Sequence, residues 1–425
     1  MLAVLRDSWA LLFGILLLML GNGLQGTLLG VRGAMEGMGA QPLSFVMSAY
    51  FLGFLIGAKA APEMIRRVGH VRVFAALASL ISAAFILYAA IPDPWVWIAL
   101  RLLVGFCFCG VYVVAESWLN DRATNETRGQ ALSAYMMMQM IGIVGAQAFL
   151  VLADPGGYTL FVLISVLISV SFAPILLSVT PAPVFQTTRR MTLRELIAAS
   201  PLGCFTAFAL GGVYAALFGM IGVYGVEAGL TVPQISILAA SIYIGGMAMI
   251  WPVGYASDRM DRRKVIVALC AMGSIAGLAG AVSGFWGLVA AAAVIGGAVN
   301  PLYSLAIAHT NDYLQPEDMA ASSAGLLFLN GVGAVGGPIL VGLLMAQFGP
   351  SGFFHYVAAL LGIIGLYGAW RMTRRPAPAP ADTAPFAPIL PASTAVALEI
   401  AQDVVQEQLA AAEDEAARHE DVNPA

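Results

Sequence analysis

Charged residues are scarce in this sequence. Lys, Arg, Asp and Glu together supply 10% of its 425 residues, whereas they make up about 25% of soluble domains. Hydrophobic residues instead reach 60%, and the mean hydropathy is +0.85. This composition excludes an ordinary soluble domain and indicates an integral membrane protein.

Cysteine is also rare, with four residues in the whole chain. Cys107, Cys109, Cys204 and Cys270 all fall within long apolar runs. Residues two positions apart on a helix, such as Cys107 and Cys109, point to roughly opposite faces. We therefore expect no disulfide, no metal site and no cofactor.

Catalytic and nucleotide-binding motifs are missing as well. The sequence contains no His-Glu-x-x-His, no Gly-x-Ser-x-Gly and no Gly-x-x-x-x-Gly-Lys-Ser/Thr. These motifs are typical of zinc proteases, serine hydrolases and P-loop ATPases. An intramembrane enzyme and an ATP-driven pump are therefore disfavoured, and we expect neither enzyme activity nor a nucleic-acid partner.

Long apolar runs fill most of the chain. A helix needs about 20 apolar residues to cross the roughly 30 Å hydrocarbon core of a bilayer. Twelve runs approach or exceed that length: 9–31, 42–61, 73–91, 95–117, 130–153, 158–179, 201–226, 233–256, 265–283, 285–309, 320–346 and 353–371. The first run is longer than a signal-peptide core and lacks a small-residue cleavage site, so we expect it to be retained. The predicted fold class is an all-α membrane protein with twelve transmembrane helices.

Basic residues lie almost entirely on one side of these predicted spans. Because Lys and Arg near span ends stay in the cytoplasm, this side is expected to be cytoplasmic, and both termini with it. It carries Arg6, Arg66, Arg67, Arg72, Arg122, Arg128, Arg189, Arg190, Arg194, Arg259, Arg262, Arg263, Lys264, Arg371, Arg374 and Arg375. Only Arg32 is expected on the outer side.

The predicted spans fall into two halves. A polar segment at 180–200, rich in Pro, Thr and Arg, cannot lie in lipid and is expected to be a cytoplasmic linker between residues 1–179 and 201–375. The halves also resemble one another, since Asn120-Asp121 aligns with Asn311-Asp312 at an offset of 191 residues (311 − 120). Duplicated six-helix units are typical of transporters that bind substrate between the repeats, although duplication also builds other helical bundles.

Residues 376–425 form a Pro/Ala-rich and acidic tail, which we expect in the cytoplasm. Nine acidic residues and one basic residue give it a net charge of −8 (1 − 9), which an anionic lipid surface repels. Thr394 or its neighbour Ser393 is a candidate cap, and Val396, Ile400 and Val404 follow at four-residue steps, as in an amphipathic helix. A disordered, dispensable extension is the favoured interpretation, and a helix for an unidentified partner is the alternative.

The loop after the eighth predicted span carries a recognisable motif. Gly254-x-x-x-Asp258-Arg259-x-x-Arg262-Arg263 resembles the G-x-x-x-D-R-x-G-R-R/K loop of the major facilitator superfamily, with Asp261 at the usual Gly position. VGHVR (68–72) and ESWLN (116–120) are similar to its bacterial YcaD-like group. The resemblance covers about residues 9–371. It implies two pseudo-symmetric six-helix bundles forming a monomeric secondary transporter of the bacterial inner (plasma) membrane.

Charged residues near the predicted cytoplasmic span ends are candidates for gating. Anchoring of the span ends explains most of the basic residues in the motif loop. The resemblance also implies that the loop pairs with neighbouring helix ends and holds one state closed, which makes gating candidates of Gly254, Asp258, Arg259, Arg262 and Arg263. Glu116 is the candidate for proton coupling or for an inner gate, although a simple cap paired with Lys59 or Arg128 is favoured.

Polar side chains within the spans mark the predicted substrate cavity. Asn22 and Gln25 are three residues apart and share a helical face. Arg101 resembles the R-x-x-x-G element of proton-coupled members, and a charge inside a span costs about 2.5 to 3.5 kcal/mol, so it should face a cavity or a partner. The other candidates are Gln139, Asn300 and Asn330. Bonding between helices, or snorkelling of Arg101 to the surface, is the alternative.

Two further patterns concern the shape of this path. The third, sixth and ninth predicted spans lack Asn, Gln and charged residues in their cores, and the twelfth has only His355, so these four are expected at the periphery. Five span tyrosines could add aromatic surface to the path, although most such residues serve packing: Tyr50, Tyr112, Tyr135, Tyr214 and Tyr243.

These features predict a secondary transporter that moves a small solute by alternating access. No carboxylate lies deep in a predicted span, so proton coupling and uniport both stay open. Arg101 and Arg32 favour an anionic solute. The alternative is a transport-inactive receptor or scaffold that acts through the tail, and deletion of residues 376–425 separates the two, because only a transporter would keep its flux.

Overall fold

The structure is a computed structural model that describes residues 8–173, 191–374, 376, 383–390 and 393–422. Within these ranges the chain forms fourteen α-helices and one short 3₁₀ helix. The first six α-helices are α2 (Trp9–Met35), α3 (Ala40–Val68), α4 (His70–Ala90), α5 (Pro94–Arg122), α6 (Asn125–Phe149) and α7 (Thr159–Ser171). The others are α9 (Leu193–Ala199), α10 (Pro201–Glu227), α11 (Val232–Ser257), α12 (Arg262–Gly280), α13 (Phe285–Asn311), α14 (Met319–Phe348), α15 (Ser351–Met372) and α16 (Ala395–Val422).

Eleven of these helices are long and apolar enough to cross a membrane. The sequence predicted a twelfth span at 158–179, and its described part is the 13-residue apolar helix α7. The remainder of that predicted span, and most of the predicted linker at 180–200, lie outside the described residues. The described spans are mostly longer than their apolar runs, because polar residues at both ends continue the helical hydrogen bonding.

Capping residues fix several helix starts. Asp93 accepts hydrogen bonds from the backbone N–H groups of Trp95 (2.9 Å) and Val96 (3.0 Å), and Pro94 occupies the first helical position of α5. Such a cap satisfies N–H groups that have no partner within the helix. Thr192 and Glu195 form a reciprocal capping box at the start of α9, just before the second group of long helices.

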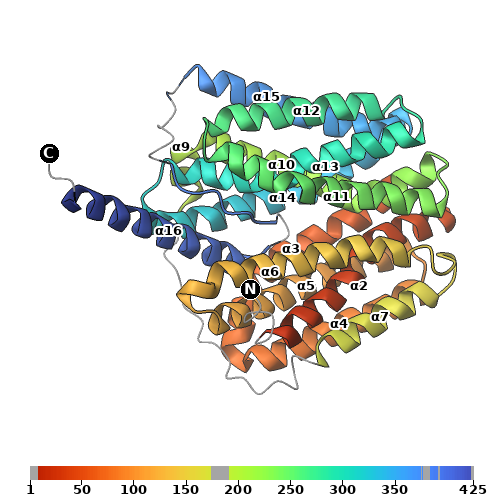
Figure 1. The fold of residues 1–425 in the computed structure, drawn as a ribbon. Coiled ribbons are helices and arrows are strands. Elements are labelled where there is room, and N and C mark those ends of the chain that lie inside the picture. The colour runs from red at the N-terminus through yellow and green to blue at the C-terminus, as the bar shows by residue number, and fades with distance from the viewer. Residues whose placement is uncertain (1–7, 174–190, 375, 377–382, 391–392, 423–425) are drawn as a thin grey trace.

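The long helices lie in two groups, α2 to α7 and α10 to α15, one above the other in Figure 1. In the first group α3 packs on α5, α2 on α6 and α4 on α7. In the second group α11 packs on α13, α10 on α14 and α12 on α15. The groups meet where α10 contacts α2, where α14 contacts α3 and where α11 contacts α6. Each pair within one group therefore has a counterpart in the other, as an internal repeat would produce.

Glycine allows the closest helix crossings, and the same positions recur in both groups. A Cβ atom added at Gly105 of α5 would lie 1.9 Å from the Tyr50 carbonyl oxygen of α3, and one at Gly296 of α13 would lie 1.9 Å from the Ile242 carbonyl oxygen of α11. Small residues let membrane helices approach at backbone distance. The two glycines are separated by 191 residues (296 − 105), the offset that relates the two Asn-Asp pairs in the sequence.

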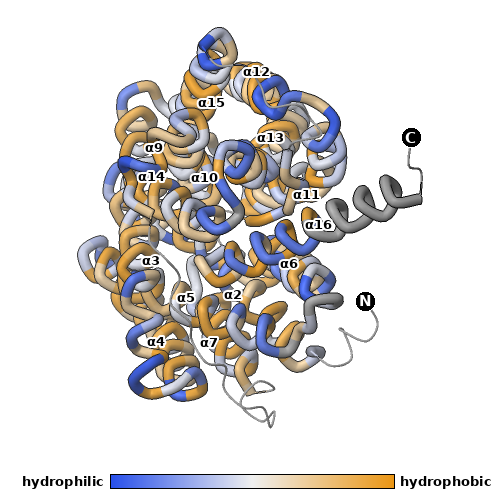
Figure 2. Tube along the Cα trace, turned by 90° about the vertical axis from the view of Figure 1, so that its left-hand side faces the viewer, coloured by the Kyte–Doolittle hydropathy of each residue, from blue (hydrophilic) through white to orange (hydrophobic). Residues whose placement is uncertain are grey.

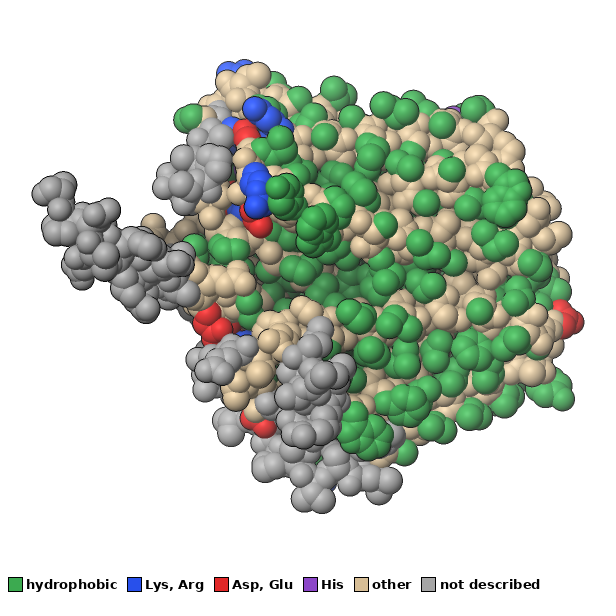
Figure 3. Space-filling view, viewed as in Figure 1, with side chains coloured by type: hydrophobic (Ala, Val, Ile, Leu, Met, Phe, Trp, Pro, Cys, Tyr) green, Lys and Arg blue, Asp and Glu red, His purple; other side chains and the backbone are tan. Residues whose placement is uncertain are grey.

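The outer surface of the helices is apolar. Figure 3 shows a broad face without charged side chains, with Lys, Arg, Asp and Glu gathered mainly at one end. Large side chains on this surface are well exposed, including Trp251 (76%), Ile275 (67%) and Leu366 (74%). Figure 2 shows hydrophobic colouring along the helices and hydrophilic colouring mainly at the loops and along part of α16. This distribution fits a multi-pass membrane protein.

The acidic tail contradicts its favoured interpretation. Residues 383–390 and the first half of α16 pack against the rest of the protein, at the end where α9 lies and where charged residues gather (Figures 1 and 3). The buried face of α16 includes Ala397, Leu398, Ala401, Gln402 and Val405, each at most 2% exposed. The expectation of disorder is therefore wrong for this part of the tail. The amphipathic helix that the spacing of Val396, Ile400 and Val404 predicted is present. Its buried face packs against the helices of its own chain and not against a separate partner.

Candidate functional site

A central cavity of about 550 Å³ lies between the two groups of helices. Its described lining residues come from α2, α3, α5, α6, α10, α11, α14 and the start of α16. Helices α4, α7, α12 and α15, which correspond to the third, sixth, ninth and twelfth predicted spans, contribute none of them. The polar content of the spans therefore predicted these four peripheral helices correctly, but α13, the tenth predicted span, was expected at the path and contributes no lining residue either.

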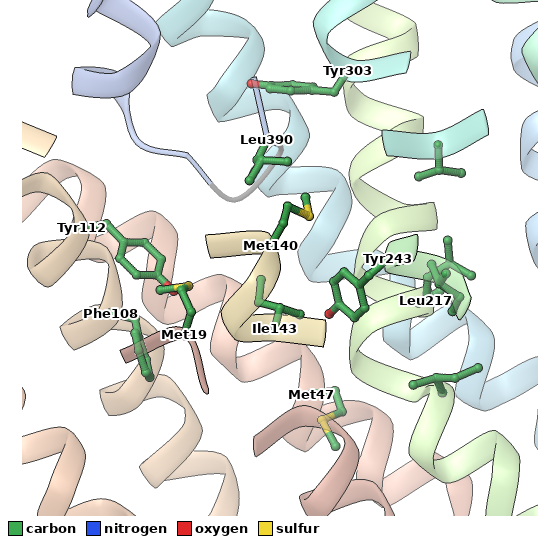
Figure 4. Packing of buried hydrophobic residues seen from close by; sticks show 14 of the residues in the cluster. Met19, Met47, Phe108, Tyr112, Met140, Ile143, Leu217, Tyr243, Tyr303 and Leu390 are labelled. Carbon is green, nitrogen blue, oxygen red and sulfur yellow. The ribbon is translucent and has the colours of Figure 1, made fainter. Parts of the chain in front are cut away.

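Aromatic side chains form much of the cavity wall. They are Tyr50, Phe51, Phe54, Tyr214, Phe218, Tyr243 and Phe328. Phe218 links two of the others, with ring centroids 4.0 Å from Tyr214 and 4.5 Å from Tyr243. Figure 4 shows Tyr243 of α11 and Ile143 of α6, two lining residues from different groups, approaching one another. The cavity thus offers flat, apolar surfaces to a bound molecule.

A chain of polar side chains crosses one wall of the cavity from α5 to α2. Arg101 Nη1 donates a hydrogen bond of 2.9 Å to Gln25 Oε1, and Gln25 Nε2 donates in turn to Asn22 Oδ1. Asn22 Nδ2 lies 2.6 Å from the Tyr112 hydroxyl, to which it donates. The predicted cavity residues Asn22, Gln25 and Arg101 are therefore brought together, and all three line the cavity.

Arg101 is buried and lacks a carboxylate partner among the described residues. Its residue exposure is 3%, and its Nε atom has no hydrogen-bond partner. Besides Gln25, it contacts the Met47 sulfur at 3.2 Å and lies 4.9 Å from the centroid of the Tyr50 ring. Such contacts orient a guanidinium but leave its charge uncompensated, which is costly inside a membrane.

The described lining of the cavity is electropositive. Lys59 of α3 lines it together with Arg101, and none of the described lining residues is Asp or Glu. Asn330, another predicted cavity residue, also lines it, and its Nδ2 donates to the Ala207 carbonyl oxygen at 3.0 Å. Amide groups beside cationic groups in an otherwise aromatic wall suit a small organic anion with an apolar body.

Two of the predicted cavity residues lie elsewhere. Asn300 is 2% exposed, donates to the Gly296 carbonyl oxygen at 3.0 Å and packs against Gly246, so it fills the contact between α13 and α11. Gln139 is also 2% exposed. Neither is among the residues that line the cavity. Sequence spacing placed them at a similar depth to Asn22 but could not show which face of each helix turns to the centre.

Glu116 is fully buried and contacts Thr394, a residue that lines the cavity. The Tyr135 hydroxyl donates to its carboxylate at 3.0 Å. Its other donors come from the tail: the Thr394 hydroxyl, the Thr394 backbone N–H at 3.4 Å and the Ala397 backbone N–H at 3.1 Å. The favoured pairing with Lys59 or Arg128 is not what holds this carboxylate. It caps the N-terminus of α16 instead.

The tail is the part of the site that sequence reasoning missed. Thr394 and Ala395 line the cavity directly, and Thr394 caps α16 by accepting from the Val396 backbone N–H at 3.3 Å. The signal was present, since a Ser-Thr pair stands directly before a helical apolar repeat. The sequence around Glu116, however, does not reveal that this buried acceptor bonds to the distant tail.

The motif loop joins its own group of helices to the tail. Arg262 forms an ion pair with Asp312 and donates to the Ala308 carbonyl oxygen at 3.0 Å, which ties α12 to α13. Asp258 lies 3.7 Å from Arg262 and accepts from the Phe386 backbone N–H at 2.9 Å. The Phe386 ring occupies the space where Gly254 has no side chain.

The other two basic residues of the motif bond locally. Arg263 pairs with Asp261 at 2.9 Å, and Arg259 stacks on the Tyr255 ring of its own helix at 3.7 Å. Asp261, which stands where the family motif usually has Gly, is the N-cap of α12 and accepts from the Arg263 backbone N–H at 3.0 Å. The departure from the family pattern therefore supplies a helix cap.

Comparison with known proteins gives one consistent result. The family described as Major Facilitator Superfamily matches residues 11–250 and 203–402. The chain is 26% identical over 362 residues to an uncharacterized MFS-type transporter, YcaD, of Salmonella heidelberg (strain SL476), a match that covers 84% of this chain and 93% of that protein. It is 25% identical over 367 residues to an uncharacterized MFS-type transporter of Yersinia pestis (strain Pestoides F), with the same coverage of 84% and 93%.

Solved structures share the fold at low sequence identity. The nucleoside transporter NupG matches with a TM-score of 0.68 and 13% identity, covering 86% of this chain and 97% of that one. A bacterial homolog of the human lysosomal transporter Spinster, in an inward-facing and occupied conformation, matches with a TM-score of 0.67 and 16% identity, covering 87% and 97%. At these identities the likeness concerns the arrangement of helices and not the substrate.

Proposed function

This chain belongs to the major facilitator superfamily and is a membrane transporter rather than an enzyme. From that premise we propose that it is a secondary transporter, which carries a small organic anion through the central cavity by alternating access. The anion would bind between the two groups of helices. The predicted organisation accompanies this proposal: twelve spans in two six-helix bundles (1–179 and 201–375) joined by a linker at 180–200, with both termini in the cytoplasm of a bacterium and the spans in its inner membrane.

The unpaired charge of Arg101 is the observation that carries the proposal. A cation inside a span is disfavoured unless a partner or water compensates it. The described protein supplies Arg101 with an amide, a thioether and an aromatic face but with no carboxylate. A bound carboxylate would supply the missing partner, and two parallel N–H donors of a guanidinium match its two oxygens.

The aromatic wall supports an apolar or aromatic body on the solute. Tyr50, Phe218 and Tyr243 present ring surfaces to the cavity, and offset or edge contacts with such rings stabilise a planar ligand. Lys59 adds a second positive charge, and Asn22, Gln25 and Asn330 add amide groups for polar substituents. A monocarboxylate with an aromatic ring uses all of these features.

Movement would follow from the contacts between the groups. Helices α2 and α10, α3 and α14, and α6 and α11 meet across the centre. A rocking motion about these contacts would open one end of the cavity and close the other. If a proton accompanies the solute, Glu116 is the buried carboxylate near the path that would carry it, and its ionised form would hold the tail more firmly than its neutral form.

Ligand-induced thermal stabilisation tests the proposal. The purified protein is heated in the presence of benzoate, phenylacetate and hexanoate, and of the matching amides, which lack the charge. We expect the aromatic carboxylates to raise the unfolding temperature, and we expect the amides to leave it unchanged. Arg101→Gln should abolish the shift, whereas Arg194→Gln, which alters an exposed arginine outside the cavity, should keep it. Stabilisation by amides equal to that by carboxylates, or an undiminished shift in Arg101→Gln, would overturn the anion assignment.

A further inference from the structure

The tail segment, defined as residues 383–390 and 393–409, lies in a groove that both groups of helices line. The second group holds its first part. Ser304 of α13 exchanges two hydrogen bonds with the backbone of Ile389, at 2.8 and 2.9 Å. Asp258 accepts from Phe386, and Arg262 donates to the Ala384 carbonyl oxygen. Leu390 follows within the buried cluster shown in Figure 4.

The first group holds the start of α16. Glu116 of α5 caps the helix through Thr394 and Ala397. Arg128 of α6 forms ion pairs with Asp403 at 3.1 Å and Glu407 at 3.3 Å. A Cβ atom at Gly129 would lie 3.5 Å from a Val404 methyl group, so α16 packs directly on the start of α6.

Gln402 joins α16 to α13 and α14. Its Oε1 accepts from Asn311 Nδ2 at 2.8 Å, and its Nε2 donates to the Ser323 hydroxyl at 3.0 Å. Gln402 is 1% exposed and Ser323 is fully buried. A glutamine whose donor and acceptor are both satisfied in a buried position fixes the register of the helix, because a displaced helix would leave these polar groups unpaired.

Attachment to both groups has a consequence for movement. Opening the cavity at this end requires the two groups of helices to separate here. The tail segment is bonded to α5 and α6 of the first group and to the second group at α12, α13, α14 and the end of α11. Thr394 and Ala395 are also part of the cavity wall. The tail segment must therefore leave its groove, or lose one set of bonds, before the groups can part.

We propose that the tail segment is an autoinhibitory clasp, which holds the cavity closed at one end. The basic residues at the span ends assign this end to the cytoplasm, and the clasp must be released before the cavity opens there. The clasp deepens the proposed function, on which it rests, by naming how access to the cavity is regulated. Its partner is the groove of its own chain, where Arg128 pairs with Asp403 and Glu407 of the tail and Arg262 donates to the Ala384 carbonyl oxygen. A released tail would stay in solution, since its charge is repelled by an anionic leaflet.

Thiol accessibility tests the clasp without a transported solute. Ser323→Cys is a conservative replacement beneath Gln402, and the four native cysteines are buried. A membrane-impermeant maleimide is applied to the protein in nanodiscs, and the rate of labelling is compared between the full chain and a chain that ends at residue 374. We expect the full chain to be protected and labelling of the shortened chain to be faster by about tenfold or more.

Matched variants of the full chain separate release from misfolding. Gln402→Ala removes both side-chain hydrogen bonds of Gln402 and should speed labelling of Ser323→Cys, whereas Gln408→Ala, at an exposed position of the same helix, should leave it unchanged. Ser165→Cys, buried between α4 and α7 through its bond to Ser82, should stay protected in the shortened chain if the helices remain folded. Equal protection of Ser323→Cys in the full chain, the shortened chain and Gln402→Ala would overturn the clasp.

A reversible lock supplies the converse test. Cysteines at Gly129 and Val404 stand at adjoining positions on α6 and α16, and oxidation should join them within one chain. In a chain that also carries Ser323→Cys and Gln402→Ala, the disulfide should restore protection, and reduction should remove it. A disulfide that forms without restoring protection contradicts the clasp. Neither test uses a solute, so both can fail while the anion assignment stands, and the anion assignment can fail while the clasp stands.

Discussion

Arg101 Nη1 lies 2.9 Å from Gln25 Oε1, which joins a buried cation on α5 to an amide on α2 at the wall of the central cavity. The residues are 76 positions apart in the sequence. The amide orients the guanidinium without neutralising it. Under the proposed function, a bound anion supplies the negative charge that the described part of the chain does not place beside Arg101.

Arg101→Gln should raise the stability of the ligand-free protein while it removes binding. The variant keeps a polar side chain near Gln25 but eliminates an uncompensated charge, whose cost in a span is about 2.5 to 3.5 kcal/mol on insertion scales. Part of this gain is offset by the lost contacts with Tyr50 and Met47. Differential scanning fluorimetry without ligand should show a higher unfolding temperature. A lower one would mean that an anion, lipid or water already compensates the charge.

The helix crossing at Gly105 should not accept a side chain. Gly105→Ala places a methyl group 1.9 Å from the Tyr50 carbonyl oxygen, so α3 and α5 must separate, at about 1 to 3 kcal/mol. Gly336→Ala is the matched control, because a Cβ there meets nothing within 4 Å and alanine is the better helix former by about 1 kcal/mol. Thermal unfolding should show a loss for the first variant and no loss for the second. Equal effects would contradict the close crossing.

Glu116→Gln should loosen the start of α16. The carboxylate accepts from two backbone N–H groups of the tail, at Thr394 and Ala397, and the amide of glutamine would turn a donor toward some of these donors. Hydrogen bonds to charged groups contribute about 1.5 to 3 kcal/mol, so amide exchange in residues 394–398 should accelerate by roughly 10- to 100-fold.

Glu63→Gln provides the control for this exchange measurement. Glu63 pairs with Arg66 and Arg67 at an exposed helix end. Its replacement removes a carboxylate of the same group of helices without touching the tail. If both variants exchange alike in residues 394–398, Glu116 does not hold α16.

Asp312 should make stability depend on pH between about 5 and 7. Burial raises the pKa of its carboxyl from 3.8 to about 6, although Arg262 and the Ala384 backbone N–H lower it and Asp261 raises it slightly. The folded protein then holds a proton near pH 5 that the unfolded chain has released, so stability rises as the pH falls from 7 to 5. Asp312→Asn should flatten this part of the curve of unfolding temperature against pH. An unchanged slope would show that other groups control it.

Sequence reasoning went furthest where one physical rule acts alone. Hydrocarbon thickness and the cost of polar groups in lipid predicted the long spans, and they also predicted that α4, α7, α12 and α15 avoid the cavity, although not that α13 does. The offset between Asn120-Asp121 and Asn311-Asp312 anticipated the repeated crossings at Gly105 and Gly296. These features depend on local composition or on comparison of one half with the other.

What could not be predicted depends on side chains that meet across the molecule. Asn22 and Asn300 looked alike as span amides, yet only Asn22 faces the cavity, because small rotations of each helix decide which face points inward. Glu116 is held by Thr394, which is 278 residues away, and no pattern near either residue reveals the other. The tail was judged by its composition, although its buried face becomes visible only beside the groove that it fills.

Uptake by proteoliposomes tests the central claim most directly. Vesicles containing the purified protein, or no protein, are given the radiolabelled form of the carboxylate that produces the largest thermal shift. The account predicts saturable uptake by the wild type, little uptake by Arg101→Gln and wild-type uptake by Arg194→Gln. Uptake by Arg101→Gln at the wild-type rate, or wild-type uptake no faster than in protein-free vesicles, would contradict it.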